Sequence, residues 1–412
     1  MHSEYEFTPV ADHARRGFFT LLVVMLGFTF FSASMYAGAN LGNGLSAARF
    51  LLAVLAGNVL LGLYTGLLAH IAARTGLSTH LLARRAFGKQ GAILPSLLLG
   101  VTQVGWFGVG VAMFALPVAQ LFPQFPRILL LAGSGACMTL TAYYGIKSLT
   151  ILSIVAVPAI ALLGSASMAK AFHDFGGVAA WFAMEPGAPL SLTAAIGICV
   201  GSFISGGTLT PDFTRYSRTP AISVSATVIA FLIGNSLMFL FGAVAAAFYQ
   251  TNDISFAMMK QGMIVVAILV LGLNIWTTND NALYAASLGF ATLANRTKRQ
   301  FVLINGFLGT VFAITAYNHF VPWLNLLNLM LPSIGAILIL DYFVVRRRNP
   351  DAEVDPGVRW AAITAWAAGF CAAKFLPGIP PLNTLLAASA AYLLLARRPS
   401  RAAPVKAGST GS

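Results

Sequence analysis

The chain has 412 residues, of which 58% are hydrophobic and 9% are charged, and its mean hydropathy is +0.80. Soluble globular proteins typically contain about 25% charged residues, so this composition excludes a soluble globule and indicates a polytopic membrane protein. The net charge of +13 does not point to nucleic acid. The basic residues lie in short loops between apolar segments, where they orient the chain and meet anionic lipid headgroups.

Twelve apolar segments, most of them near the roughly 20 residues that a spanning helix needs, follow one another along the chain. They are Phe18–Tyr36, Phe50–Ala72, Ile93–Leu116, Ile128–Tyr144, Leu149–Ala169, Leu190–Ile204, Ala221–Phe248, Met263–Leu288, Phe301–Ala316, Val321–Val345, Trp360–Phe375 and Leu382–Ala396. We therefore expect an all-α protein with twelve transmembrane helices in one domain at 17–397. A cytoplasmic tail at 1–16 precedes it, and a disordered tail at 398–412 follows it.

The distribution of basic residues predicts the orientation of this domain. All but five of the 25 Lys and Arg residues fall in one set of loops and tails, and the five others are Arg49, Arg127, Lys170, Lys260 and Lys374. Because Lys and Arg are retained in cytoplasmic loops, both termini are expected in the cytoplasm. The expected location is the inner membrane of a bacterium.

Two apolar segments are interrupted by Gly and Ser. The first segment runs into FFSASMYAGANLG at 30–42, and the sixth runs into GSFISGGTLT at 201–210. Such breaks weaken a helix and are tolerated where they line a cavity, and paired breaks in two halves are typical of transporters. The spacing from Ser32 to Trp106 nearly equals that from Ser205 to Trp276. We therefore predict inverted repeats at 17–170 and 190–346, with two peripheral helices at 358–397.

The eighth segment carries the densest polar cluster, GLNIWTTNDN at 272–281. Polar groups at this depth each cost several kcal/mol in hydrocarbon unless they face a partner, a ligand or water. A site at the membrane midplane is therefore expected here, close to the polar third segment that holds Thr102, Gln103 and Trp106.

Longer stretches of the chain carry a resemblance to a known family. They are FTFFSASMYAG at 28–38, STHLLARRAFG at 78–88, TQVGWFGVG at 102–110, GSFISGGTLTPDFTRY at 201–216, GNSLMFLFGA at 234–243 and LGLNIWTTNDNALY at 271–284. In these stretches the chain resembles the nucleobase-cation-symport-1 family. The resemblance implies a leucine-transporter-like five-plus-five inverted repeat with broken helices 1 and 6. It also implies import of a nucleobase, here expected to be cytosine, driven by a cation gradient.

A flat, neutral ring such as cytosine needs aromatic faces and fixed polar groups in the ring plane. Trp106 and Phe203 suit the stacking role, and the resemblance assigns their positions to a sandwich around the base. The expected groups at the ring edge are Gln103, Ser202, Ser205 and Asn279, assisted by unwound backbone near 205–208. The expected partners are thus a small nucleobase and membrane lipid, with no nucleic acid, and the protein is expected to be a monomer.

A sodium site is predicted beside the base. Asn274, Thr277 and Thr278 have the spacing i, i+3, i+4, which can align a carbonyl and two hydroxyls on one helical face. The resemblance completes the site with two carbonyls three residues apart on the first helix, matched here by Phe31 and Ser34. Proton coupling through Asp280 remains an alternative.

Each assignment has a structural alternative. Trp106 could be a core aromatic, the two threonines could bond back to their own helix, and the serines could serve close helix packing. A proton-coupled permease for another nucleobase or a hydantoin is the nearest functional alternative. A channel and a membrane-embedded enzyme are alternatives of other classes, although the helices carry no HExxH and no GxSxG motif, and we expect no catalytic residues.

Overall fold

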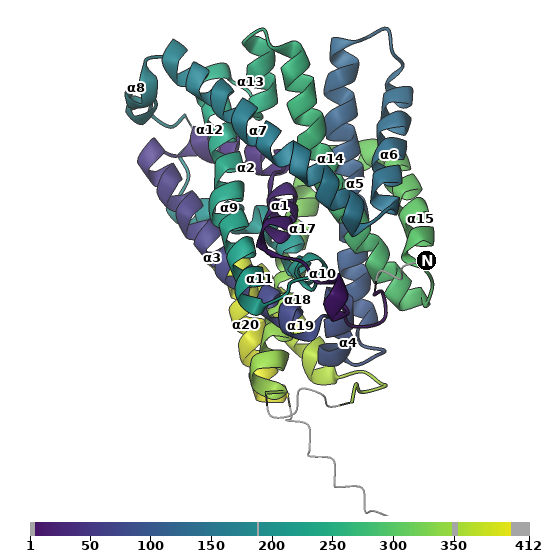
Figure 1. Cartoon of the computed structure of the whole chain (residues 1–412). Coiled ribbons are helices and arrows are strands. Elements are labelled where there is room, and N and C mark those ends of the chain that lie inside the picture. The colour runs from purple at the N-terminus through teal and green to yellow at the C-terminus, as the bar shows by residue number, and fades with distance from the viewer. Residues whose placement is uncertain (1–4, 188, 348–352, 397–412) are drawn as a thin grey trace, which may run out of the picture.

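The computed structural model describes residues 5–187, 189–347 and 353–396, so the tail predicted at 398–412 lies outside the described residues. Helices lie side by side in one bundle (Figure 1). Their bounds are η1 Asp12–Ala14, α1 Phe18–Thr29, α2 Ser32–Gly44, α3 Ala47–Thr75, α4 Thr79–Phe87, α5 Ile93–Leu121, α6 Arg127–Tyr143, α7 Ile146–Asp174, α8 Gly177–Ala183, α9 Leu192–Thr208, α10 Thr210–Thr214, α11 Pro220–Ile229, η2 Ala230–Asn235, α12 Ser236–Tyr249, α13 Ile254–Lys260, α14 Ile264–Ala294, α15 Lys298–Val311, α16 Ala313–Asn318, α17 Phe320–Met330, α18 Pro332–Leu340, η3 Asp341–Val345, α19 Trp360–Phe375 and α20 Pro380–Leu395.

Every predicted apolar segment is helical in this structure, which confirms the all-α prediction. Several segments are built from more than one helix, because short turns interrupt them. The seventh, for example, comprises α11, the π-helical turn η2 and α12. Among the described residues, six helical stretches are long and apolar enough to cross a membrane, and α1 with α2 makes a seventh if that bent pair is one span.

The first segment breaks at Phe30 and Phe31, where α1 and α2 meet at a bend of 56°. Phe31 has extended backbone angles, φ −140° and ψ 133°. The Gly- and Ser-rich stretch that follows is helical and forms α2. The predicted break is therefore present, and it lies at the start of the predicted stretch.

The sixth segment breaks at Leu209, near the end of the predicted stretch at 201–210. α9 is regular through Thr208, and only Leu209 separates it from α10. The expectation of unwound backbone at 205–208 is therefore wrong. The glycines in this stretch serve packing instead, because a Cβ at Gly206 would meet the ring of Phe28 at 2.9 Å and one at Gly207 would meet Thr65 at the same distance.

α2 and α12 pack with their backbones in direct contact. A Cβ at Gly38 would overlap the carbonyl group of Phe239, and a Cβ at Gly242 would overlap the carbonyl group of Met35. Glycine at both positions lets the two helices approach more closely than any other residue would allow.

Residues 5–16, which we call the terminal strap, pack against the end of the bundle where α1 begins. The backbone N–H of Val10 donates to Gly76 at 2.9 Å, and the carbonyl of Tyr5 accepts from the Arg215 guanidinium at 2.7 Å. The Glu6 carboxylate accepts from the backbone N–H of Lys298 at 2.9 Å. The strap thus joins the ends of α3, α10 and α15 and covers this end of the bundle.

The same end contains a buried polar pair. His80 is buried in α4, where its ring bonds to Ser96 at 3.1 Å and packs against Gly289. The imidazole also lies 3.9 Å from the carboxylate of Asp212, which accepts from the backbone N–H of Thr79 at 2.8 Å. The ring fits here because α4 packs against α14 at Gly289, where a side chain would occupy the space of the imidazole.

Candidate functional site

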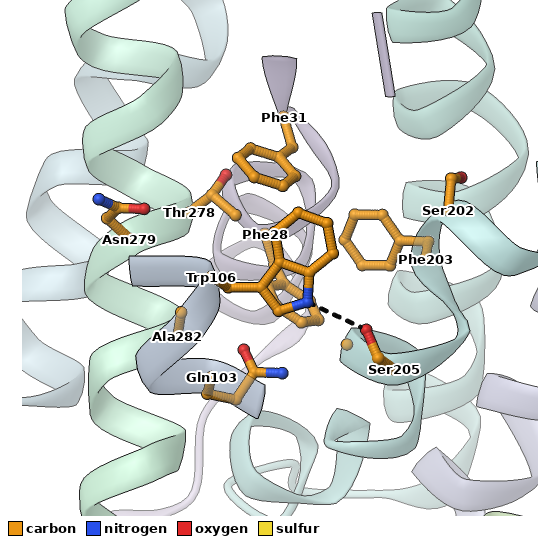
Figure 2. A pocket seen from close by; sticks show the side chains of 11 residues that line it. Phe28, Phe31, Gln103, Trp106, Ser202, Phe203, Ser205, Thr278, Asn279 and Ala282 are labelled. Carbon is orange, nitrogen blue, oxygen red and sulfur yellow. Dashed lines mark hydrogen bonds between the residues drawn. The ribbon is translucent and has the colours of Figure 1, made fainter. Parts of the chain in front are cut away.

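A buried cavity lies beside the break between α1 and α2, where α5, α9 and α14 converge on it (Figure 2). All six residues predicted to bind the substrate line it. The complete lining is Phe28, Phe31, Gln103, Trp106, Ser202, Phe203, Ser205, Gly206, Thr278, Asn279 and Ala282. Residues from distant parts of the chain are therefore brought together as the sequence predicts.

Four aromatic rings line the cavity. The rings of Phe31 and Trp106 lie edge to face with their centroids 5.3 Å apart, and Phe28 contacts Phe203 in the same way at 5.1 Å. The indole N–H of Trp106 donates to the hydroxyl of Ser205 at 3.2 Å (Figure 2). Trp106 is thus a buried aromatic that also crosses the cavity to α9.

The amide of Gln103 points into this space (Figure 2). The side chain is only 2% exposed, and its Nε2 has no hydrogen-bond partner in the part of the chain that the structure describes. A buried amide donor without a partner costs about 1–3 kcal/mol. A ligand atom that accepts a hydrogen bond would remove this cost.

The other predicted polar groups are more engaged with the protein. The hydroxyl of Ser202 donates to the carbonyl of Cys199 on its own helix at 2.9 Å. The amide of Asn279 donates to the carbonyl of Phe107 at 3.1 Å and points away from the cavity (Figure 2). Asn279 therefore lines the site while its side chain holds α14 against α5.

The free space in this cavity is small. Its volume is about 20 Å³, which suffices for one or two waters and not for a six-membered ring. A larger cavity of about 360 Å³ lies further along the bundle, away from the terminal strap. Ser32 and Tyr36 of α2 line it together with Asp253 and Asn318. The aromatic cavity must widen to admit a ring.

Beside the aromatic cavity, three carbonyl oxygens surround the hydroxyl of Thr278. They belong to Phe30 at 2.9 Å, Asn274 at 3.3 Å and Gly27 at 3.5 Å. A hydroxyl has one proton and can satisfy one of these oxygens fully. The carbonyls of Gly27 and Phe30 lie at the negative end of the broken helix α1, and together with the Asn274 carbonyl on α14 they form an oxygen-rich site suited to a small cation.

The two carbonyls that α1 contributes differ from the predicted ones. The carbonyl of Phe31 accepts from the backbone N–H of Ser34 at 3.0 Å inside α2, and the Ser34 hydroxyl bonds to Asn235 at 2.8 Å. The structure places Gly27 and Phe30, three residues apart, against Thr278 instead. Phe31 and Ser34 lie one helical turn further along the chain than Gly27 and Phe30, because α1 ends at Thr29, before the Gly- and Ser-rich stretch.

The remaining predicted residues flank this oxygen cluster. The hydroxyl of Thr277 bonds to the carbonyls of Leu273 and Asn274, both at 3.0 Å, as the structural alternative expects. The side chain of Asn274 accepts from Ser32 at 3.0 Å. Asp280 faces α6 rather than the cavity, and its carboxylate accepts from Thr141 at 2.7 Å.

Sequence reasoning missed Phe28 and Ala282 in the cavity and Gly27 and Phe30 beside it. An apolar residue in a membrane helix has no sequence signal that separates a cavity wall from ordinary packing. A carbonyl ligand has none at all, because every residue carries one.

Broken helices around a buried polar site, in a bundle of apolar helices, define a membrane transporter architecture. The sequence model of a family described as permeases for cytosine/purines, uracil, thiamine and allantoin matches residues 9–393. The chain belongs to this family, and its relatives are permeases rather than enzymes.

Individual relatives support this membership. The cytosine permease of Escherichia coli K12 is 52% identical over 389 residues, which cover 94% of this chain and 93% of that protein. The hydantoin permease of Microbacterium maritypicum is 24% identical over 421 residues, covering 90% of this chain and 84% of that protein.

Solved structures share the fold. The nucleobase-cation-symport-1 transporter Mhp1, in a closed conformation with bromovinylhydantoin bound, superposes with a TM-score of 0.85 at 21% identity over 96% of this chain and 95% of that one. A Na⁺-coupled sialic acid symporter gives a TM-score of 0.72 at 12% identity over 93% and 91%. These likenesses confirm the leucine-transporter-like five-plus-five fold with broken helices 1 and 6.

Proposed function

We propose that this protein imports cytosine by symport with Na⁺, through alternating access, as a monomer in the inner membrane of a bacterium. Both termini then lie in the cytoplasm. The observation that carries the proposal is the convergence of Gln103, Trp106, Phe203 and Ser205 on one aromatic cavity. The identity of 52% to a cytosine permease supports the choice of ring.

Recognition of the base would use both faces and one edge of the ring. Trp106 and Phe203 line the cavity from two helices and offer aromatic surfaces, and stacking of a base on such a surface contributes about 1–3 kcal/mol. The unpartnered Nε2 of Gln103 would donate to a ring acceptor, such as the carbonyl oxygen or the unprotonated ring nitrogen of cytosine. Ser205 can accept from a donor on the ring once Trp106 releases it.

The coupling ion would bind at the oxygen cluster around Thr278. Na⁺ prefers several oxygen ligands, and this cluster supplies carbonyls from Gly27, Phe30 and Asn274 beside a hydroxyl, with Thr277 next to it. Thr278 also lines the aromatic cavity. An ion here would fix the break in α1–α2 and thereby shape the base site, which couples the two ligands.

Alternating access requires that the base reach the cavity from one side at a time. The terminal strap covers the end of the bundle that we assign to the cytoplasm. The 360 Å³ cavity lined by Ser32 and Tyr36 lies toward the other end and would be the route from outside. Inward release then requires the strap end to open.

A binding titration tests the proposal. Purified protein should bind cytosine more tightly in NaCl than in choline chloride, and Trp106→Ala should abolish binding, whereas Trp360→Ala, at a residue that is 70% exposed, should not. Equal affinity in both salts would refute sodium coupling and leave the base site intact. Competition of uracil and hydantoin with cytosine measures the ring selectivity of the site. In a separate uptake assay, a rate that does not saturate with cytosine concentration would indicate a channel.

A further inference from the structure

A second recess, separate from the aromatic cavity, lies at the strap end of the bundle. Its volume is about 730 Å³, and it is bordered by the terminal strap, the start of α7, Tyr216 and the start of α15. We call it the basic recess. Its lining is Tyr5, His13, Ala14, Arg16, Tyr144, Ile146, Lys147, Ser148, Ile151, Tyr216 and Arg299.

Three cations border this recess, and all three are exposed: Arg16, Lys147 and Arg299. Within the described residues, the side chains of Arg16 and Lys147 form no ion pair and no hydrogen bond, and Arg299 only stacks over the ring of Tyr143 at 5.1 Å. Charged side chains near the recess already have partners within the protein. Arg15 pairs with Asp12 at 3.1 Å, and the Glu6 carboxylate caps the backbone of Lys298.

No carboxylate belongs to the lining of the basic recess in the described part of the chain. Three like charges around one space repel one another, and an anion in that space would be attracted to all of them. Tyrosine and serine hydroxyls of the same lining can donate hydrogen bonds to an anionic oxygen. The chemistry therefore fits a phosphate group.

The apolar surroundings distinguish between a free phosphate and a lipid headgroup. Ile146 and Ile151 line the recess on its α7 side. From Ile151, at 58% exposed, the outer face of α7 continues through Ile154 at 55% and Val155 at 60%. A headgroup in the recess would thus have its acyl chains along an exposed apolar helix face. A free anion makes no use of that face.

We propose that the basic recess binds the phosphate headgroup of an anionic phospholipid from the cytoplasmic leaflet. Basic pockets between transmembrane helices on the cytoplasmic side are suited to such headgroups. This proposal rests on the proposed function in one respect, which is that the strap end of the bundle faces the cytoplasm.

Binding would have a consequence for transport. Arg16 precedes α1, Lys147 begins α7 and Arg299 begins α15, so one phosphate would hold three separate elements together at the strap end. A ligand shifts a conformational equilibrium toward the state that binds it better. The lipid therefore favours the state that is closed toward the cytoplasm, and inward release requires its contacts to loosen.

The test uses the full-length protein purified in detergent, with phosphatidylglycerol or phosphatidylcholine of the same acyl chains, or inorganic phosphate, added. Phosphatidylglycerol should raise the melting temperature and remain bound in native mass spectra. Replacement of Arg16, Lys147 and Arg299 by Gln should weaken retention by about a hundredfold, at about fivefold for each charge. The single variant Lys147→Gln should show about a fivefold loss of phosphatidylglycerol retention. This variant keeps the test valid if the triple variant misfolds.

The matched control replaces Arg74, Lys89 and Arg347 by Gln, which removes the same charge from exposed positions outside the recess. This control should retain phosphatidylglycerol as the unmodified protein does. Equal loss in both triple variants, or equal stabilisation by inorganic phosphate, would overturn the proposal. Cytosine binding in lipid-free detergent is measured in parallel, so that a failure of the base site is seen separately.

Discussion

The hydroxyl of Thr278 on α14 donates to the carbonyl oxygen of Phe30 across 2.9 Å, and this bond ties the polar helix to the break between α1 and α2. Gly27 and Asn274 place two further carbonyls within 3.5 Å of the same hydroxyl. A cation here would replace a single hydrogen bond by several oxygen contacts. The proposed base and ion sites would thus share one residue, because Thr278 also lines the aromatic cavity.

The first prediction concerns this threonine. Thr278→Val keeps the shape of the side chain but removes an oxygen ligand, so cytosine affinity in NaCl should fall to the value measured in choline chloride. Thr278→Ser should retain the salt dependence. Calorimetric titration in both salts measures the effect. The control is Thr65→Val, because within the described part of the chain the Thr65 hydroxyl bonds only to carbonyls of its own helix, at Leu61 and Gly62. A salt response that persists in Thr278→Val would place the ion elsewhere.

The second prediction concerns the unpartnered amide. Gln103→Leu removes the Nε2 donor, and loss of its hydrogen bond to the base should cost about 1–3 kcal/mol, or about 5- to 150-fold in cytosine affinity. The unliganded protein should be as stable as before or slightly more stable, because the substitution also removes a buried orphan donor. Thermal unfolding without cytosine checks this second result.

The adjacent Thr102 provides the comparison for Gln103, since its hydroxyl donates to the carbonyl of Leu98 on its own helix at 2.6 Å. Thr102→Val should leave cytosine affinity within about twofold of the unmodified protein. Similar losses in the two variants would mean that this turn of α5 acts through packing rather than through a contact with the base.

The third prediction concerns a glycine that faces Asn279. A Cβ at Gly110 would overlap the amide of Asn279, so Gly110→Ala must displace this side chain from its bond to Phe107. We expect destabilisation by about 1–3 kcal/mol, as for other overpacked sites, together with weaker cytosine binding. Gly133→Ala is the control because nothing lies within 4 Å of its Cβ. That variant should be neutral or slightly stabilising, as alanine favours the helix.

The fourth prediction concerns pH. Burial lowers the pKa of His80, which lies outside the spanning helices, so the folded protein holds this ring neutral. Below the ordinary histidine pKa of about 6.5, the unfolded chain binds a proton that the folded chain does not, and stability falls as the pH falls. His80→Gln removes this proton difference.

The melting temperature of the unmodified protein should therefore drop more between about pH 7 and pH 5 than that of His80→Gln. Burial also raises the pKa of the neighbouring Asp212, which acts in the opposite direction on acidification. Asp212→Asn should thus show a steeper loss than the unmodified protein. Parallel pH profiles for all three proteins would contradict the role of this pair.

The sequence predicts the helices and the residues that line the aromatic cavity because both depend on side-chain chemistry. Trp106, Gln103 and Phe203 stand out as aromatic and polar groups in apolar segments, and they line one cavity. The carbonyls of Gly27 and Phe30 beside Thr278 could not be predicted from the sequence, because backbone atoms are the same at every position. The burial of His80 could not be predicted from the sequence, because it depends on Gly289, which is distant in the chain and leaves room for the ring.

The contact between α2 and α12 limits how this protein can change shape. Because Gly38 and Gly242 leave no layer of side chains between the two backbones, α2 and α12 must move together as one rigid body. The extended backbone at Phe30 and Phe31 is the nearest hinge about which this pair of helices can rotate. A rotation of the α2–α12 pair moves Ser32 away from Asn274. The hydrogen bond between these two residues therefore reports directly on the position of the pair.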